Sequence, residues 1–244
     1  MADRAALITG GSSGIGLAIA RALAEDGYGV TVSARRPEKL EAAVAGLTDD
    51  GLDVHAVAAN VVNEEEIVAM VDAHRERYGR LDVLVNNAGL GVGASIDEYE
   101  TKALDMQLAV NVRSYVLATR EAAGMLKEAG GEHGKALIVN TASIAGKSGQ
   151  AWISVYSATK FAVVGFSQAM QKELGQHGIQ VTALCPGFVD TPMTEWARGH
   201  VKQEEMIRPE DIAEGVRLLL RVSPNCVIPE IVFARPNELL EGAP

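Results

Sequence analysis

The sequence predicts a doubly wound α/β domain, in which helices cover both faces of a parallel sheet. Short apolar runs alternate with longer helical stretches along the 244 residues, and this alternation is the pattern of that fold class. Runs such as Ala5–Thr9, Leu81–Val85 and Ala136–Asn140 are largely apolar on both faces, as parallel strands are when helices bury both sides. In such sheets ligands bind beyond the carboxyl ends of the strands, so we expect the functional residues there.

Local signals mark the ends of the expected elements. Pro37 suits the first turn of a helix, where a missing amide hydrogen costs nothing. Asn63 is typical of an N-cap, the glutamates after it suit the positive helix end, and Gly79 suits a helix stop. The expected strands are Ala5–Thr9, Gly29–Ser33, Val54–Ala58, Leu81–Val85, Ala136–Asn140, Gln180–Leu184 and Val227–Phe233. The expected helices are Ile15–Glu25, Pro37–Leu47, 64–78, Lys102–Ala129, Ser154–Gln176 and Pro209–Arg221.

The composition suits one large domain that spans residues 1–244. With 48% apolar residues the chain is long enough to bury a sizeable core. Its net charge of -10 argues against non-specific binding to nucleic acid or anionic membranes, which needs a basic surface. No apolar stretch approaches the roughly 18 residues that cross a bilayer, and the first residues lack a secretion signal. The 2 cysteines and 5 histidines show no disulfide or metal-ligand spacing, so we expect a cytoplasmic protein without a metal.

A glycine-rich motif, Thr9–Gly16, follows the first strand and opens the first helix. Glycines there permit a tight turn and let a pyrophosphate approach the backbone, while the helix N-terminus offers amide donors and partial positive charge. The alternative is a glycine-rich turn without a ligand, which this strand–turn–helix setting disfavours. The expected cofactor residues of the motif are Gly10, Ser12, Ser13, Gly14, Ile15 and Gly16.

The end of the second strand indicates which dinucleotide is bound. An acidic residue at this place would bind a ribose 2′-hydroxyl and favour NAD, but the run is Ser33-Ala34-Arg35-Arg36. A guanidinium offers a planar fork of donors that suits a 2′-phosphate. We therefore expect NADP(H), with Arg35 on the phosphate, whereas Arg36 also fits a solvated charged loop.

Tyr156 and Lys160 lie four apart on one face of the expected helix Ser154–Gln176. A phenol has an ordinary pKa of about 10, and a nearby ammonium favours the phenolate and lowers that pKa. Such a tyrosine would exchange a proton with a substrate oxygen at useful pH. The same spacing also occurs by chance on many helices, where both residues only pack on the surface.

Four motifs in order resemble the short-chain dehydrogenase/reductase family. They are Thr9–Gly16, Asn86-Asn87-Ala88-Gly89, Ser143 with Tyr156 and Lys160, and Pro186-Gly187, and the likeness covers nearly the whole chain. The resemblance implies a Rossmann fold with a seven-stranded sheet in the order 3-2-1-4-5-6-7. It also implies a nicotinamide cofactor and hydride transfer between that cofactor and a carbonyl or alcohol.

The resemblance assigns further cofactor residues. Asn60 stands where the family usually has an aspartate that accepts a hydrogen bond from the adenine amino group, and an asparagine oxygen would accept the same bond. Thr191 resembles the threonine that binds the nicotinamide carboxamide, although Thr191-Pro192 would also suit the start of a helix. The cofactor residues implied in this way are Asn60, Val61, Asn87, Ala88, Gly89, Tyr156, Lys160, Pro186, Gly187, Val189 and Thr191, with Asn86 bracing the sheet.

The resemblance also assigns the catalytic residues. Ser143 would hold the substrate oxygen against the Tyr156 hydroxyl, and Lys160 would lower the tyrosine pKa and bind the nicotinamide ribose. Asn111 would hold a water that links Lys160 to solvent, whereas on sequence alone it also fits a polar helix face. The implied substrate pocket is Leu90, Ile144, Gln150, Trp152 and Phe188, with residues 190–208 as a mobile lid.

Three functions stay open at this point. The leading one is an NADPH-dependent reductase of a small or medium carbonyl compound, or the reverse alcohol dehydrogenase. A 3-oxoacyl thioester reductase is the second, which the ending Pro229–Pro236 disfavours because many family members close with Asp-Gly-Gly instead. A catalytically silent NADP-binding regulator is the third. The family also implies a homodimer or homotetramer, to which Val112, Val116, Phe161 and Val164 would contribute unless they serve the core.

Overall fold

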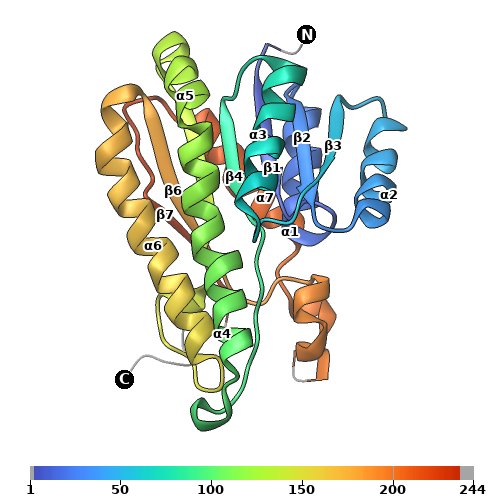
Figure 1. The fold of residues 1–244 in the computed structure, drawn as a ribbon, viewed down its shortest axis with the longest axis vertical. Helices are drawn as coiled ribbons and strands as arrows, with labels where there is room; N and C mark the ends of the chain where they lie inside the picture. The colour runs from blue at the N-terminus through green and yellow to red at the C-terminus, as the bar shows by residue number, and fades with distance from the viewer. Residues whose placement is uncertain (1–2, 200, 237–244) are drawn as a thin grey trace.

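Helices cover both faces of a seven-stranded parallel sheet in the computed structural model, which describes residues 3–199 and 201–236 (Figure 1). The strand order is β3-β2-β1-β4-β5-β6-β7 and every neighbouring pair is parallel. The expected fold class and strand order are therefore confirmed. The outer parts of the expected domain, 1–2 and 237–244, and position 200 of the expected lid lie outside the described residues.

The elements follow one another as strand and helix through most of the chain. The strands are β1 Ala5–Thr9, β2 Gly29–Ala34, β3 Val54–Ala58, β4 Val83–Asn86, β5 Ala136–Thr141, β6 Ile179–Pro186 and β7 Glu230–Phe233. The α-helices are α1 Gly14–Glu25, α2 Pro37–Thr48, α3 Glu64–Tyr78, α4 Thr101–Leu108, α5 Ser114–His133, α6 Ser154–Leu174 and α7 Pro209–Arg221. Short 3₁₀ segments after β6, Pro192–Gly199 and Gln203–Glu205, lie in the expected lid.

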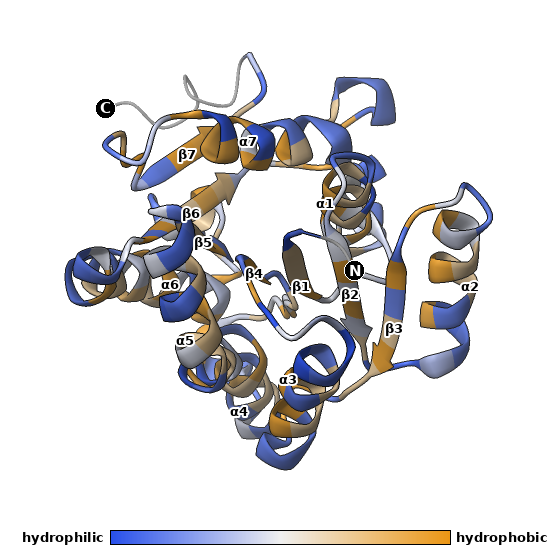
Figure 2. Cartoon of the chain, turned by 90° about the horizontal axis from the view of Figure 1, so that it is seen from above, coloured by the Kyte–Doolittle hydropathy of each residue, from blue (hydrophilic) through white to orange (hydrophobic). Residues whose placement is uncertain are grey.

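Successive residues of the central strands serve two separate cores. Ala6 and Ile8 of β1 pack with residues of α1, α2 and α7, whereas Leu7 between them packs with residues of α3 and α5. Figure 2 shows these helix sets on opposite faces of the twisted sheet. Each of these three strand residues is fully buried, which explains why the strands read as continuous apolar runs.

The largest departure from the expected elements is the long helix Lys102–Ala129. It consists of α4, a π-helical segment Ala109–Arg113 and α5, and it continues to His133 before Gly134 ends it with φ +69. A π segment adds a residue to the turn and redirects the side chains on it. Hydrophobic periodicity does not reveal that insertion, because the flanking helical patterns remain intact.

Smaller differences from the expected bounds occur at the ends of other strands and helices. β4 begins at Val83 rather than Leu81, and β7 begins at Glu230 rather than Val227, although Leu81 is still buried in the core. Asn63 occupies the N-cap position of α3, but its side chain makes no capping bond. The side-chain amide of Asn63 donates instead to the Glu66 carboxylate. That carboxylate also accepts a hydrogen bond from the backbone N–H of Asn60.

Within residues 3–199 and 201–236, no helix is both long and apolar enough to span a bilayer. The same part of the chain holds no group of three or more His, Cys, Asp or Glu side chains that could bind a metal ion.

A buried histidine makes the stability of the fold sensitive to acid. His74 of α3 is fully buried; its Nε2 donates to the Arg80 carbonyl (2.9 Å) and its Nδ1 lies 2.8 Å from the Thr31 hydroxyl. Burial lowers its pKa to about 4. Between that value and the ordinary pKa near 6.5, the unfolded chain binds a proton that the folded chain does not. Stability is therefore lost as the pH falls from about 6.5 toward 4.

We expect His74→Gln to flatten this dependence. The wild type should lose about 1.4 kcal/mol per pH unit for the extra proton, measured as the urea-unfolding free energy at several pH values between 4 and 7. The glutamine variant starts less stable but should lose that slope. His177→Gln, which changes an exposed histidine, is the matched control. An unchanged slope in the His74 variant would contradict the assignment.

Candidate active site

The loop between β1 and α1 is packed so closely that each of its four glycines, Gly10, Gly11, Gly14 and Gly16, leaves no room for a Cβ. Gly10 (φ +68) and Gly14 (φ +56) adopt backbone conformations that other residues rarely take. A Cβ on Gly10 would lie 2.8 Å from the Cα of Ala88, and one on Gly16 would lie 2.5 Å from Nδ2 of Asn87. The glycines therefore let the loop pack against Asn87 and Ala88 after β4. Gly10 and Gly14 also line the first cavity described below.

The N-terminus of α1 lacks both a side-chain cap and an acidic residue in its first turn. Ser13 is the N-cap residue but its side chain makes no capping bond, and the first turn contains no acidic residue. The first amides of a helix have no intrahelical acceptor and carry partial positive charge. This end of α1 is therefore suited to an anion.

Asn87 joins the glycine loop to the centre of the sheet. Its side chain donates to the Thr9 carbonyl (3.1 Å) and the Gly10 carbonyl (3.2 Å), and it accepts from the Thr141 hydroxyl (3.2 Å). The Thr9 hydroxyl accepts from the backbone of Asn87 and Ala88. Asn86 points the other way and donates to Asn140 in the sheet. The Asn-Asn pair thus fixes the ends of β1, β4 and β5 relative to one another.

We expect Gly16→Ala to weaken both the fold and anion binding at this loop. The added methyl group would meet Asn87 and, at 2.6 Å, the carbonyl oxygen of Gly10, so the loop must shift. Gly46→Ala in α2 is the matched control, because a Cβ there meets nothing within 4 Å; alanine in an open helix position should stabilise by about 0.5–1 kcal/mol. Thermal unfolding and NADPH titration of the two variants check this, and equal behaviour would contradict it.

Three side chains of the expected catalytic group lie at the carboxyl end of the sheet. Tyr156 and Lys160 come from the first turns of α6, and Ser143 follows β5. The Lys160 ammonium donates to the Thr141 carbonyl (2.7 Å) and lies 5.5 Å from the centre of the Tyr156 ring. The Ser143 hydroxyl accepts from the Ala145 amide (3.1 Å) and lies close enough to Tyr156 to act on its pKa.

The expected lowering of the Tyr156 pKa by Lys160 is wrong for this structure. Tyr156 is partly exposed as a residue, yet its phenol lies among enough protein atoms that burial raises its pKa to about 12, with Ser143 acting weakly in the other direction. Burial also lowers the pKa of Lys160 to about 8. Both groups are shielded from water, so burial favours the neutral form of each. The Lys160 ammonium donates its hydrogen bond to the Thr141 carbonyl rather than to the phenol.

Asn111 lies in the π segment and is fully buried. Its side-chain amide donates to the Leu90 carbonyl (2.8 Å) and the Thr159 hydroxyl (3.0 Å), and its oxygen accepts from the Leu90 amide (2.8 Å). The residue therefore clamps the loop after β4 to α6. Asn111, for which the sequence alone also allowed a polar helix face, is a buried connector, and its water link to Lys160 stays a prediction.

Two cavities meet at Ser143 and Tyr156. The first, of about 220 Å³, runs from the glycine loop to these hydroxyls. The second, of about 380 Å³, opens on their other side beneath the lid. The expected residues that line the first cavity are Gly10, Ser13, Gly14, Ile15, Asn87, Ala88, Gly89, Ser143, Tyr156, Lys160, Pro186, Gly187, Val189 and Thr191. The expected residues that line the second are Ile144, Gln150, Trp152 and Phe188, with Ser143 and Tyr156.

Other expected cofactor residues lie outside the lining of both cavities. Arg35 is exposed just past β2, and neither its guanidinium nor that of Arg36 makes a hydrogen bond or ion pair with a described residue. Asn60 is partly buried and its side-chain oxygen accepts from the Val62 amide at 3.4 Å. Ser12, Gly16, Val61, Asn111 and Leu90 also lie outside both linings.

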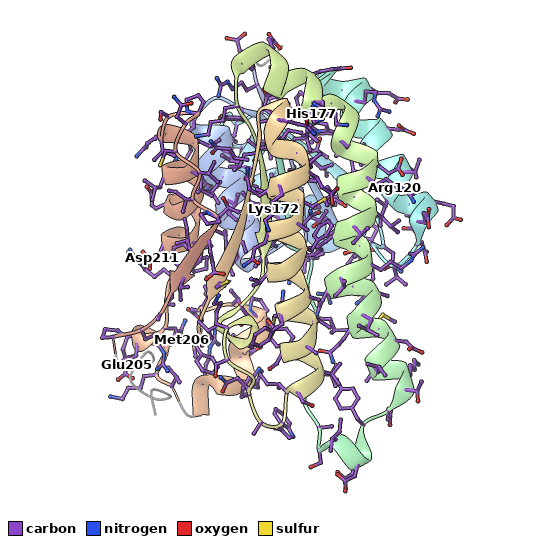
Figure 3. The ribbon with its side chains drawn as sticks, turned by 90° about the vertical axis from the view of Figure 1, so that its left-hand side faces the viewer. Arg120, Lys172, His177, Glu205, Met206 and Asp211 are labelled. Carbon is purple, nitrogen blue, oxygen red and sulfur yellow. The ribbon has the colours of Figure 1, made fainter. Side chains whose placement is uncertain are left out.

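The lid contributes residues that sequence reasoning missed. Met193 and Thr194 line both cavities and Trp196 lines the second, together with Gly91 and Gly93 after β4. A tryptophan in an otherwise polar segment was the available signal for Trp196. Asp190 holds the lid through Arg198 (2.9 Å) and Gln203 (2.6 Å). Figure 3 shows Glu205 and Met206 of this segment at one end of the molecule, opposite His177.

Comparison with known families agrees with this arrangement. The family model described as short chain dehydrogenase matches residues 4–201. The chain belongs to the short chain dehydrogenase family. The resemblance drawn from the four sequence motifs is thereby confirmed.

This short chain dehydrogenase is similar to proteins named as polyketide ketoreductases and as an alcohol dehydrogenase. One is "Granaticin polyketide synthase putative ketoacyl reductase 1" of Streptomyces violaceoruber, 44% identical over 199 residues, which are 80% of this chain and 71% of the relative. A crystal structure of an actinorhodin polyketide ketoreductase variant with NADPH has a TM-score of 0.86 and 36% identity, covering 95% of this chain and 97% of that one. An alcohol dehydrogenase from the archaeon Thermococcus sibiricus, complexed with 5-hydroxy-NADP, has a TM-score of 0.85 and 30% identity, covering 96% and 98%.

Proposed function

We propose that this enzyme transfers hydride between NADP(H) and a carbonyl or secondary-alcohol substrate, with Tyr156 as the acid or base. The observation that carries the proposal is that Ser143 and Tyr156 line both cavities. One cavity is bounded by a glycine loop and a helix N-terminus, and the other has mainly apolar walls. A donor in the first and a carbonyl in the second would meet beside a proton source, so proximity supplies part of the rate.

The residues of the first cavity, together with Arg35 and Asn60 outside its lining, fit an NADP dinucleotide. The α1 N-terminus without an acidic residue suits the pyrophosphate, and the exposed Arg35 suits a 2′-phosphate. The relatives crystallised with NADPH and with an NADP derivative support the same choice. Asn60, Ala88 and Thr191 would hold the adenine and nicotinamide ends, as the family resemblance implies.

The protein's own part in the reaction is to hold and move one proton. When bound, NADPH supplies the hydride to the carbonyl carbon. Ser143 donates a hydrogen bond to the carbonyl oxygen, and Tyr156 transfers its phenolic proton to that oxygen as the negative charge develops. Because burial holds the pKa of Tyr156 at about 12, the phenol carries this proton throughout the neutral pH range. Lys160, an ammonium below about pH 8, then stabilises the phenolate that remains.

A panel assay tests the proposal. NADPH consumption is followed with simple ketones, 3-oxoacyl thioesters and hydroxy acids (the last with NADP⁺). Turnover of ketones well above that of the thioesters supports the leading function. Tight NADPH binding without turnover of any carbonyl would identify a regulator and overturn it.

The second candidate is a 3-oxoacyl thioester reductase. It is favoured by the ketoacyl reductase name of a relative that is 44% identical. A thioester substrate would place its acyl chain in the apolar cavity and its carrier outside the lid. Preferential turnover of 3-oxoacyl thioesters in the same panel would select this function.

The assembly is also a proposal. Val116 and Phe161 expose 42% and 47% of their surface on the outer sides of α5 and α6, whereas Val164 is buried in the core. We infer that α5 and α6 contribute to a homodimer or homotetramer, with Val164 excluded from the contact. Sedimentation analysis of the wild type and Phe161→Glu tests this, and a wild-type monomer would refute it.

A further inference from the structure

Aromatic side chains surround the apolar cavity opposite the two hydroxyls. Trp152 comes from the loop before α6, Trp196 from the lid and Phe188 from the segment after β6. The ring centres of Trp152 and Trp196 lie 6.1 Å apart, and those of Phe188 and Trp196 also lie 6.1 Å apart, each pair edge to face. Both tryptophans expose more than half of their surface, 57% and 58%. Two large apolar rings therefore border this cavity without being covered.

The backbone and a neighbouring glycine hold the Trp152 ring in place. Trp152 has φ +68, and it is the only residue other than glycine with a positive φ among residues 3–199 and 201–236. Its carbonyl accepts from the Ala94 amide (2.8 Å), and a Cβ on Gly93 would lie 2.5 Å from its ring. Glycine or asparagine would take this conformation with less strain. The backbone conformation and the close approach of Gly93 together fix where the Trp152 ring lies.

The chemistry of the cavity lining limits its occupant. The residues that line it carry no charged side chain, and Gln150 is the one amide among them. Its volume of about 380 Å³ lies near the lower end of small-molecule sites, which suits one or two fused rings. Aromatic walls gain energy from a stacked or edge-on ring beyond that of area burial, whereas an extended acyl chain gains only the area term.

We propose that Trp152 and Trp196, whose rings meet edge to face, form one angled aromatic wall of this cavity, here called the slot, against which a flat aromatic ring packs, so that the preferred substrate is a ketone fused or attached to such a ring. This proposal rests on the function proposed above and names its substrate class. The two tryptophans are the specificity-determining residues, and Gly93 is a positioning residue that acts through Trp152.

A set of three ketones with equal carbon counts tests the slot. Tetralone is flat and aromatic, decalone is a thicker saturated bicycle, and straight-chain decanone is extended. We expect the wild-type kcat/KM for tetralone to exceed both others by about tenfold. Trp152→Leu and Trp196→Leu should each lower the tetralone value about tenfold and change the other two less than threefold, while Trp196→Phe should restore most of it. An equal loss for all three ketones, or no tetralone preference in the wild type, overturns the proposal.

Alanine substitutions at two glycines test whether Gly93 positions the Trp152 ring. Gly93→Ala should displace the Trp152 ring and remove the tetralone preference. Gly149→Ala, in the loop that leads to Trp152, meets nothing within 4 Å and should keep it. Equal preferences in the two variants would contradict the role of Gly93.

A binding readout separates this proposal from the proposed function. The chain has only 2 tryptophans, so fluorescence that is excited where tyrosine does not absorb reports on the slot alone. Tetralone titrated in the presence of NADP⁺ should change the emission saturably in the wild type and in both single leucine variants, more weakly in the latter, whereas decanone should not. Saturable binding without turnover of any ketone would retain the slot and refute the reductase. Turnover of ketones without a saturable tetralone signal would refute the slot.

Discussion

Tyr156→Phe is expected to lower turnover by roughly 10²–10⁴-fold and to leave NADPH binding nearly unchanged. The substitution removes the hydroxyl at the junction of the two cavities and keeps the ring, which packs at the start of α6. The phenol is the group that carries a proton at neutral pH beside Ser143, so its loss leaves the developing oxyanion without a proton donor. Steady-state kinetics with the best ketone of the panel and an NADPH titration measure the two effects.

Tyr28→Phe is the matched control for this variant. It removes a buried tyrosine hydroxyl just before β2, at the amino end of the sheet, and should leave turnover unchanged. More than a tenth of the wild-type turnover in Tyr156→Phe would contradict the proton-transfer role. A parallel loss of NADPH affinity with an unchanged melting temperature would assign the hydroxyl to cofactor binding, and a lowered melting temperature would show that the substitution disturbs the fold.

Arg35→Asp is expected to lower the preference for NADPH over NADH by on the order of 10²-fold. A hydrogen bond to a charged group contributes about 1.5–3 kcal/mol, and the new carboxylate adds repulsion toward a 2′-phosphate. NADH has only a hydroxyl at this place, and an aspartate can accept a hydrogen bond from it. The kcat/KM for each cofactor at a saturating ketone concentration measures the change.

Arg36→Asp serves as the control, because it makes the same change in net charge one residue later. Both guanidinium groups are exposed and have no partner among the described residues, so long-range charge effects should be similar. A clearly smaller effect at position 36 assigns the phosphate to Arg35. Equal weakening of NADPH and NADH binding by Arg35→Asp would refute the assignment.

Much of the fold was predictable because its signals are local and strong. Continuous apolar strands and the glycine motif indicated a parallel sheet with ligands at the strand ends, and the four motifs indicated the family and its strand order. The cavities confirm that Gly10, Tyr156 and Gly187 converge from distant parts of the chain. Strand ends are close in space in any such sheet, so the motifs alone were sufficient to bring these residues together.

The rest depended on contacts that no local pattern encodes. The family resemblance assigned Asn111 a water that links Lys160 to solvent, but only the folded chain shows that Asn111 lies buried in a π segment, where it holds Leu90. The lowering of the Tyr156 pKa was expected from the nearby charge, whereas burial, which only the folded chain sets, is the larger effect. Trp196 lines the second cavity because the lid segment folds over it, and the spacing of residues in the sequence does not predict how the lid folds.

The two cavities differ in how freely they can be altered by mutation. Glycines and Asn87 line the first together with the catalytic side chains Ser143, Tyr156 and Lys160, so substitutions there would disturb either the glycine loop or the catalytic group. Side chains from loops and the lid shape the second, and the two share only Ser143, Tyr156, Gly187, Met193 and Thr194. A mutant library limited to Gln150, Trp152 and Trp196 would therefore retarget the enzyme to new ketones while its affinity for NADPH is inherited unchanged.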